Sequence, residues 1–495
     1  MFWLVHLSGL TLPFAVALTA NIVMMFVAGV ALMLRVQLHG WLDAWLVSPE
    51  ARAFAKLSEL AAEAAPRART ARLAFGYNAN LDAVSNATTV LAAVRASEHS
   101  SATIVARDFV RIETAAELLA CFAHFFAIGA AAERHVESRL FDRVVALAIA
   151  DATHTALSPG GNAALMANAA ARAGADVLLG GPIGARLRPL LHGDIRTVSA
   201  AGDASPQDQV HLILEYGVGD RFGELVATRA NRFILHSDNV NGRIEGLDDF
   251  HAAARQFQPH AIVAAGLHLL QEQPHAFRSQ RVDDVRRQLE AMPAGVLTHF
   301  EFASIGERAF TAEVTRALLA SVDSIGFNEQ ELGDIYASVG GAQWPPEHFA
   351  KAPRDAVVPA LVFLFDLSER LYRDALLAGR AARLLSRIHF HYLAYHIVAV
   401  REDGVWQGGR EAVAAGSLAV TLAACSMSET AALDSERVEL RASDTSVKSE
   451  RAELADGRFV WLHTAPVLVC RKPLRTVGLG DVVSSTALAT MEFNK

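Results

Sequence analysis

The sequence predicts an α/β protein built on a large, doubly wound and mostly parallel β-sheet flanked by helices. Short apolar segments of strand length alternate with amphipathic helical segments through most of the chain, which is typical of parallel strands joined by crossover helices. Polar residues also follow several of these apolar segments. Because ligands bind such sheets outside the carboxyl ends of the strands, these polar residues mark a candidate site.

Composition limits the possible functions. The chain has 495 residues, a length that favours more than one domain. Its 45 Lys and Arg against 53 Asp and Glu give a net charge of -8, so no global basic surface for nucleic acid is expected. The three cysteines, Cys121, Cys425 and Cys470, form no CxxC pair, and neither a disulfide framework nor a thiolate zinc site is expected.

The N-terminal segment differs from the rest of the chain. Residues 1–34 contain no Asp, Glu, Lys or Arg and are mostly apolar. This run exceeds the roughly 20 apolar residues that span a bilayer, so it predicts a membrane anchor. The alternative is a cleaved signal sequence, but the run is long for one and the usual positive charge before it is missing. Basic residues from Arg35 onward favour a cytosolic position for the following chain.

The next segments lead into the expected globular region. Residues 35–72 predict a surface helix followed by a basic linker that contains Pro66, and the folded region is expected to begin directly after it. A strand then starts and presents Asn78, Asn80 and Asp82 at alternate positions, on one side if the strand continues. The alternative is an Asx-type turn that ends the strand.

Two helical segments follow. Residues 113–133 have helical periodicity and end in small residues around Glu133, which either reaches a ligand or is an exposed charge. Residues 158–174 predict a glycine turn at Gly160 and Gly161, a cap at Asn162 and an alanine-rich helix.

Further apolar segments predict the remaining strands of the sheet. They span residues 176–184, 211–216, 231–236, 261–266, 295–303, 323–328 and 387–392. Arg232, in the third of them, is either structural or a phosphate clamp. Two polar stretches, 339–355 and 434–457, predict surface loops.

Two pairs of polar residues stand at predicted strand ends. His299 and Glu301 share a face of a strand, and Asn328 and Glu331 share a face if Asn328 opens a helix. Carboxylate and amide oxygens with several waters suit Mg²⁺. A solvated face or a helix cap is the alternative for each pair taken alone.

The C-terminal segment predicts an anion pocket. Residues 466–470 form an apolar run of strand length, and after a turn Gly478, Gly480 and Asp481 open a helix of small residues. The free N–H groups of a helix start suit phosphate oxygens. Asp481 is then either a general base that deprotonates an attacking hydroxyl or a helix cap.

These motifs, in this order, resemble the ADP-dependent sugar kinases of the ribokinase-like superfamily, and among them the animal-type glucokinases. The resemblance covers about residue 73 to the C-terminus, and the apolar N-terminus also resembles that of the animal enzymes. The motifs span residues 78–82, 129–134, 160–163, 211–216, 230–234, 299–301, 328–331, 389–391 and 475–481. The region between residues 90 and 108 and the two polar stretches depart from the family pattern.

The resemblance implies a role for each matched residue. The sugar pocket would consist of Asn80, Asp82, Glu133, Gly160, Gly161 and Asn162. The catalytic group would consist of Asp481 as general base, Arg232 on the transferring phosphate, and Gly478 and Gly480 at the anion hole. One or two Mg²⁺ ions would be held, mainly through water, by Glu301, Asn328, Glu331 and Asp481. The nucleotide would contact His391, Val469, Arg475 and Val477.

The resemblance also implies the overall activity. ADP would phosphorylate glucose to glucose 6-phosphate and leave as AMP, within a kinase domain of residues 73–495. A smaller lid with β-strands, roughly within residues 77–133 and 210–242, would close over the sugar. The domain would be monomeric and associated with the endoplasmic reticulum membrane, or would enter the secretory pathway if the N-terminus is cleaved.

Two alternatives to the glucokinase hypothesis remain at this point. The first is an ADP-dependent 6-phosphofructokinase, but the carboxylate of Glu133 suits a neutral sugar hydroxyl and would repel a sugar phosphate. The second is an inactive, membrane-tethered protein that binds a sugar or nucleotide. The presence of Asp481 argues against the loss of activity.

Overall fold

The computed structural model of the chain describes residues 48–98, 104–130, 132–150, 155–199, 207–427, 436–442, 444–473 and 477–493. The predicted N-terminal anchor and Arg475 lie outside these residues. Within them, no helix combines the length and the apolar character needed to cross a membrane.

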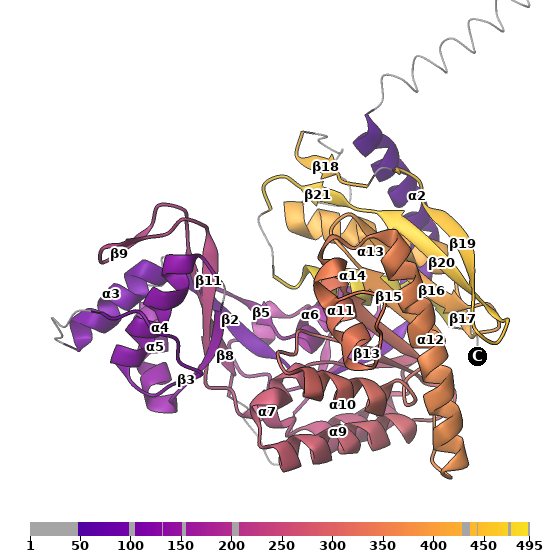
Figure 1. The fold of residues 1–495 in the computed structure, drawn as a ribbon, viewed down its shortest axis with the longest axis horizontal. Helices are drawn as coiled ribbons and strands as arrows, with labels where there is room; N and C mark the ends of the chain where they lie inside the picture. Colours follow the sequence, from indigo (N-terminus) through magenta and orange to yellow (C-terminus); the bar gives the residue numbers. More distant parts are fainter. Residues whose placement is uncertain are drawn as a thin grey trace, which may run out of the picture.

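A ten-stranded sheet forms the centre of the larger part of the molecule (Figure 1). From one edge to the other its strands are β19 (Lys448–Glu453), β20 (Phe459–Pro466), β16 (Tyr395–Arg401), β15 (Arg387–His391), β14 (Ser324–Asn328), β13 (Leu297–Glu301), β12 (Ala261–Ala264), β1 (Arg72–Gly76), β6 (Asp176–Gly180) and β7 (Arg196–Val198). The strands from β15 to β7 pair in parallel, whereas β16, β20 and β19 are antiparallel. The predicted doubly wound, mostly parallel sheet is therefore confirmed.

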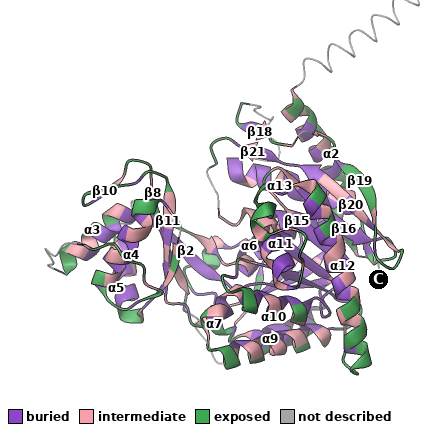
Figure 2. Ribbon diagram, viewed as in Figure 1, coloured by how far each residue is buried: buried purple, intermediate pink, exposed green. Residues whose placement is uncertain are grey.

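Helices cover both faces of this sheet, whose central strands are buried. Along β1, Ala74 packs into one core, whereas Leu73 and Phe75 pack into the other. The first core contains α8 (Leu247–Phe257), α9 (His275–Glu290), α10 (Arg308–Leu318), α11 (Glu329–Ser338) and α12 (Arg354–Leu377). The second contains α2 (Pro49–Thr70), α6 (Asn162–Arg172), α13 (Gly409–Cys425) and α14 (Leu479–Ala489). The central strands are accordingly buried between the two helical layers (Figure 2).

A six-stranded sheet forms the core of the smaller part, on the left in Figure 1. Its order is β3 (Arg111–Ile112), β4 (Ala132–Val136), β11 (Asn231–His236), β8 (Val210–Tyr216), β2 (Asn80–Asn86) and β5 (Ala156–Gly160). One face packs against α3 (Ala87–Ser97), α4 (Ala115–Ile128) and α5 (Ser138–Ala150) in a separate apolar core. The other face carries Asp82, His211 and His236 in one cross-strand row. The smaller sheet therefore presents a polar face.

Short elements complete the chain. They are α7 (Val240–Arg243), the 3₁₀ turns η1 (Arg188–Leu190), η2 (Leu267–Glu272) and η3 (Pro346–Lys351), and the strands β9 (Arg221–Phe222), β10 (Leu225–Val226), β17 (Trp406–Gln407), β18 (Val438–Leu440), β21 (Leu468–Cys470) and β22 (Glu492–Phe493).

The region expected to be a surface helix and a linker differs from the prediction. From Pro49 onward it is one helix, α2, which continues through Pro66 to Thr70. Leu57 and Leu60 are buried in the core that α2 shares with α13. The fold therefore begins before residue 73, because this helix has an apolar face that needs a partner.

The strand expected to start at residue 73 does not continue to Asp82: β1 ends at Gly76 and β2 starts at Asn80, so that β1 belongs to the large sheet and β2 to the small one. The alternative in which the first strand ends is thus the one observed. Two other local predictions were wrong. Helix α4 ends at Gly129, whose φ of 64° is left-handed, and Glu133 lies on β4 instead of at the end of a helix. The stretch 434–457, expected to be a loop, contains β18 and β19.

The C-terminal strand and the cysteines also differ from expectation. The apolar run at 466–470 is divided between β20, which ends at Pro466, and β21, which pairs with β18 outside the large sheet. Cys425 at the end of α13 and Cys470 on β21 form a disulfide across a sequence separation of 45 residues. The sequence shows no framework of disulfides, and this single bridge is made only by the tertiary fold.

Candidate active site

Asp481 lies in the first turn of α14 and is buried. The two glycines before it are required by close contacts. Gly478 has a φ of 72°, and a Cβ atom there would lie 2.6 Å from Leu165 Cδ1. A Cβ atom on Gly480 would lie 2.9 Å from His391 Cε1. The predicted helix start after a glycine turn is thus present, with the carboxylate beside free N–H groups at the positive end of the helix.

Asn162 connects this helix to the glycine turn of the predicted sugar pocket. Its Nδ2 donates a 2.9 Å hydrogen bond to Asp481 Oδ1. Asn162 was expected to cap α6, but Gly161 is the cap residue, with a φ of 82° and no side-chain cap hydrogen bond. As the first residue of the helix, Asn162 has a side chain that is free to orient the carboxylate of Asp481.

Asn80 and Asp82 lie on the other side of the same glycine turn. Asn80 Nδ2 donates a 2.6 Å hydrogen bond to Asp82 Oδ1, and both side chains are buried. A Cβ atom on Gly160 would overlap both of them. Asn78 points elsewhere, since its Oδ1 accepts a hydrogen bond from the N–H of Ala163 at 3.1 Å. The structure therefore brings together five of the predicted sugar-pocket positions, while Asn78 fixes the start of α6.

Glu133 reaches the same polar face from β4. Its side chain is 43 % exposed, and its Oε1 lies 3.7 Å from His211 Nδ1. Burial lowers the pKa of His211, but the hydrogen bond that His211 donates to Asp238 and the charges of Glu133, Asp238 and Asp82 raise it to about 9. A positively charged His211 therefore faces Glu133. Sequence reasoning missed the roles of His211 and Asp238 because their pairing depends on the register of the sheet.

Arg232 lies farther along this face. On β11 it is in register with Glu215 of β8, and Asn86 of β2 is in register with the same residue. The three residues border a cavity of about 780 Å³. Arg232 thus shares the polar face with His211 and Glu133 but belongs to the smaller sheet, whereas Asp481 belongs to the helical layer of the larger one.

Glu301 is the centre of a buried hydrogen-bond network at the carboxyl end of β13. Its Oε2 lies 2.8 Å from His299 Nε2 and accepts a 2.6 Å hydrogen bond from Ser484 Oγ of α14. Its Oε1 lies 3.3 Å from His391 Nε2. Burial would raise the pKa of Glu301, but the hydrogen bonds from His299 and His391 lower it to about 2. Glu301 is therefore held as a carboxylate, and Ser484 couples it to the helix of Asp481.

Asn328 and Glu331 form a capping box at the start of α11. Asn328 Oδ1 accepts a 2.8 Å hydrogen bond from the N–H of Glu331, and Glu331 Oε2 accepts a 2.9 Å hydrogen bond from the N–H of Asn328. Burial, aided by the charges of Glu301 and Asp481, outweighs the opposing effects of His391 and of the hydrogen bond from the N–H of Asn328, so the pKa of Glu331 is raised to about 7. The cap interpretation is therefore correct as geometry, but it leaves a buried carboxylate electrostatically close to two others.

This arrangement fits a magnesium ion that keeps much of its hydration shell. Among the described residues, no group of three His, Cys, Asp or Glu side chains could hold a metal ion directly. The charges of Glu301 and Asp481 both raise the pKa of Glu331, and a hydrated cation nearby would balance this negative charge. Oxygen donors of this kind suit Mg²⁺ better than a softer metal.

The residues expected to contact the nucleotide lie at separate places around the start of α14. His391 ends β15. Its Nε2 faces Glu301, and its ring lies beside Gly480. Val469 on β21 packs against a small apolar cluster that includes Val483 of α14. Val477 directly precedes the glycine turn.

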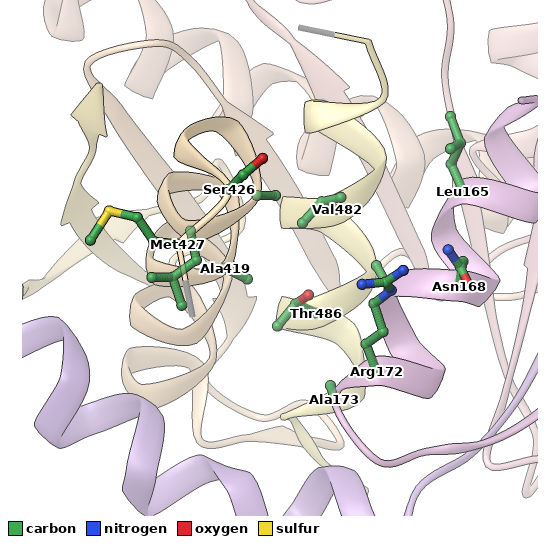
Figure 3. Close-up of a pocket in the computed structure, with 12 residues that line it drawn as sticks. Leu165, Asn168, Arg172, Ala173, Ala419, Ser426, Met427, Val482 and Thr486 are labelled. Carbon is green, nitrogen blue, oxygen red and sulfur yellow. The ribbon is translucent and has the colours of Figure 1, made fainter. Parts of the chain in front are cut away.

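A separate cavity of about 510 Å³ lies among α6, α13 and α14 (Figure 3). Leu165 and Asn168 border it from α6, and Val482 and Thr486 border it from α14. No described residue that was predicted for the site lines it. The cavity is therefore a neighbour of the Asp481 helix, and Leu165 lies between it and the glycine turn at Gly478.

Comparison with known proteins decides the family. The conserved region of ADP-specific phosphofructokinases and glucokinases matches residues 71–490. The chain belongs to this family. A Bos taurus protein described as ADP-dependent glucokinase is 34% identical over 464 residues, which cover 90% of this chain and 89% of the relative. A Caenorhabditis elegans protein described as probable ADP-dependent glucokinase is 33% identical over 445 residues, 86% of each chain.

Solved structures of family members share the fold. The last common ancestor of ADP-dependent phosphofructokinases from Methanosarcinales aligns with a TM-score of 0.63 at 17% identity, over 88% of this chain and 97% of that one. An ADP-dependent kinase in complex with fructose-6-phosphate and ADPβS aligns with a TM-score of 0.60 at 15% identity, over 88% and 97%. The α/β architecture with a large and a smaller sheet, expected from the resemblance, is thus that of the ADP-dependent sugar kinases.

Proposed function

We propose that the protein phosphorylates D-glucose at its 6-hydroxyl, with ADP as the donor, and releases AMP and glucose 6-phosphate. The observation that carries the proposal is the contact between Asn162 and Asp481, which joins a sugar-side glycine turn to a carboxylate at a helix start. Membership in a family of ADP-specific sugar kinases supports the donor. The two relatives with at least 33% identity, both described as glucokinases, support the acceptor.

The chemistry assigned to the chain is general-base catalysis with electrostatic stabilisation. Asp481 takes the proton of the 6-hydroxyl as its oxygen attacks the β-phosphorus, and the bond from that phosphorus to the leaving AMP oxygen breaks. The N–H groups around Gly478 and Gly480 stabilise charge on the transferring group. Arg232 adds a positive charge when the smaller sheet closes over the sugar and excludes water.

A bound Mg²⁺ would supply positive charge that neutralises the charge of the transferring phosphate. Glu301, Glu331, Asn328 and Asp481 are the residues proposed to hold it, mainly through its water shell. Glu301 is suited to this role because His299, His391 and Ser484 keep it ionised and fixed.

Glu133 supports glucose over fructose 6-phosphate. Its carboxylate is half exposed beside His211, where it can accept hydrogen bonds from neutral hydroxyls but repels a phosphate. Residues 1–34 remain a proposed anchor to the endoplasmic reticulum membrane.

A coupled assay on the full-length protein tests the proposal. Glucose and fructose 6-phosphate are each offered with ADP or ATP in the presence of Mg²⁺. The expected result is turnover of glucose with ADP. A preference for fructose 6-phosphate would instead identify a phosphofructokinase, and binding of glucose without turnover would identify an inactive sugar-binding protein.

A further inference from the structure

Asp238 and Asn241 form a buried polar pair where the chain passes from the smaller sheet to the larger part of the molecule. Asp238 follows β11, and Asn241 lies in α7. Asp238 Oδ1 accepts a 2.9 Å hydrogen bond from the N–H of Asn241, and Oδ2 accepts a 2.6 Å bond from Asn241 Nδ2. Both residues are at most 5 % exposed. We call this pair the junction bracket.

Asn241 ties the bracket to a second crossing between the sheets. Its Oδ1 accepts a 3.2 Å hydrogen bond from the N–H of Ala79, and its Nδ2 donates a 3.0 Å bond to the carbonyl of Ala79. Ala79 lies between β1 and β2 and directly precedes Asn80. Asn241 thus pairs with both the N–H and the carbonyl of Ala79. It thereby fixes the backbone that presents Asn80 and Asp82.

Asp238 ties the bracket to the opposite side of the sugar pocket. Its Oδ2 lies 3.2 Å from His211 Nε2, while His211 Nδ1 faces Glu133 at 3.7 Å. A carboxylate can only accept a hydrogen bond, so Nε2 must carry a proton. The other ring nitrogen faces a second carboxylate, which favours a proton there as well.

Other titratable groups surround His211 and oppose or support its charge. Asp82 of β2 is in register with it, and the ring of His236 on β11 stacks on it with a centroid distance of 5.1 Å. His236 Nε2 also lies 3.5 Å from Glu272 Oε1 of η2. His268 of η2 stays neutral near this group because burial lowers its pKa to about 4. At His211 the negative charges of Glu133, Asp238 and Asp82 dominate, and they raise its pKa.

We propose that Asp238 and Asn241 are positioning residues for sugar recognition: Asp238 orients His211 toward Glu133, and Asn241 fixes the peptide that presents Asn80 and Asp82. One buried pair thereby sets the two halves of the sugar pocket relative to each other. This inference rests on the proposed function, because it takes Glu133, Asn80 and Asp82 as the groups that meet the sugar.

The test compares two substitutions in the full-length protein with a matched surface control. Asp238→Asn removes the charge that orients His211 but keeps the side-chain size. Asn241→Ser removes the contacts with Ala79 and leaves the contact between Asp238 and His211 possible. Glu245→Gln changes an exposed carboxylate just beyond α7, whose Oε1 lies 3.7 Å from Arg243 Nε. Steady-state kinetics for glucose and for ADP are measured across pH, and the melting temperature reports folding.

Both bracket variants are expected to raise the KM for glucose about 10- to 100-fold, the range for losing a hydrogen bond to a charged group. The KM for ADP and kcat should change much less, because His391, Val469 and Val477, the described residues proposed to contact the nucleotide, lie on the larger part. In the wild type the positive charge on His211 is lost only as the pH rises through about 9. Asp238→Asn should therefore move the rise in KM for glucose to lower pH, whereas Asn241→Ser should leave its pH dependence unchanged.

Folded bracket variants whose KM for glucose stays within about twofold of the Glu245→Gln control would overturn the proposal. Equal losses for glucose and ADP would do the same, because they indicate a general structural defect. If Asp238→Asn does not fold, the Asn241→Ser result decides the question. If the wild type does not use glucose, the proposed function fails separately. The junction bracket is then tested by NMR titration of His211 in the sugar-free protein. If the titration midpoint of His211 is the same in Asp238→Asn as in the wild type, the role of Asp238 is contradicted.

Discussion

Replacement of Asp481 by Asn tests the assigned mechanism most directly. The substitution removes the proton acceptor but preserves the side-chain shape, and the amide oxygen can still accept the hydrogen bond from Asn162. General-base catalysis contributes about 10²- to 10⁴-fold, so kcat should fall by that factor, equivalent to about 3–5.5 kcal/mol. Stability should change little, because a charge at a helix N-terminus contributes only about 0.3–1 kcal/mol.

The assay follows formation of glucose 6-phosphate from glucose and ADP, with glucose affinity measured separately by calorimetry. Asp355→Asn is the matched control, because Asp355 is also an acidic residue in the first turn of a helix but is exposed. Glucose should bind Asp481→Asn with nearly wild-type affinity, as expected when only a transition-state interaction is lost. A kcat within tenfold of the control would refute the role of Asp481 as base.

Three further predictions follow from neighbouring contacts. Gly480→Ala places a methyl group 2.9 Å from His391 Cε1, so both the turnover rate and the affinity for ADP should decrease. An unchanged KM for ADP in this variant would contradict the prediction. Asn162→Ala removes the hydrogen bond to Asp481 and should lower kcat by about 10- to 100-fold, as single-turnover kinetics would show. Cys470→Ser opens a disulfide that closes a loop of 45 residues, so the free energy of unfolding should fall by about 4 kcal/mol in denaturant titrations.

Much of the large sheet could be predicted because its central strands are short buried segments with at least one apolar face. The segments that became β12, β13, β14 and β15 all lie within the predicted ranges. Edge strands lack this signal. β19 reads Lys-Ser-Glu-Arg-Ala-Glu and is almost wholly exposed, so its polar sequence indicated a loop. Its pairing with β20 supplies the structure that its own residues do not specify.

The candidate site could be predicted where its residues are close in sequence. The glycine turn before Asp481 and the pair His299 and Glu301 follow from local spacing, and both geometries are present. Contacts across the sheet could not be predicted. Ser484 meets Glu301 across 183 positions, and Asp238 meets His211 only because β8 and β11 are antiparallel neighbours. The roles assigned to these residues stay predictions until the variants are measured.

Helix α2 enters the fold at the end of the molecule opposite the smaller sheet (Figure 1). It packs on α13, so any force applied to the chain at Pro49 acts on the helical layer that covers one face of the large sheet. The smaller sheet stays clear of that attachment. The proposed anchor would therefore attach to the larger part of the molecule, and the proposed closure of the smaller sheet over the sugar would not require α2 to move.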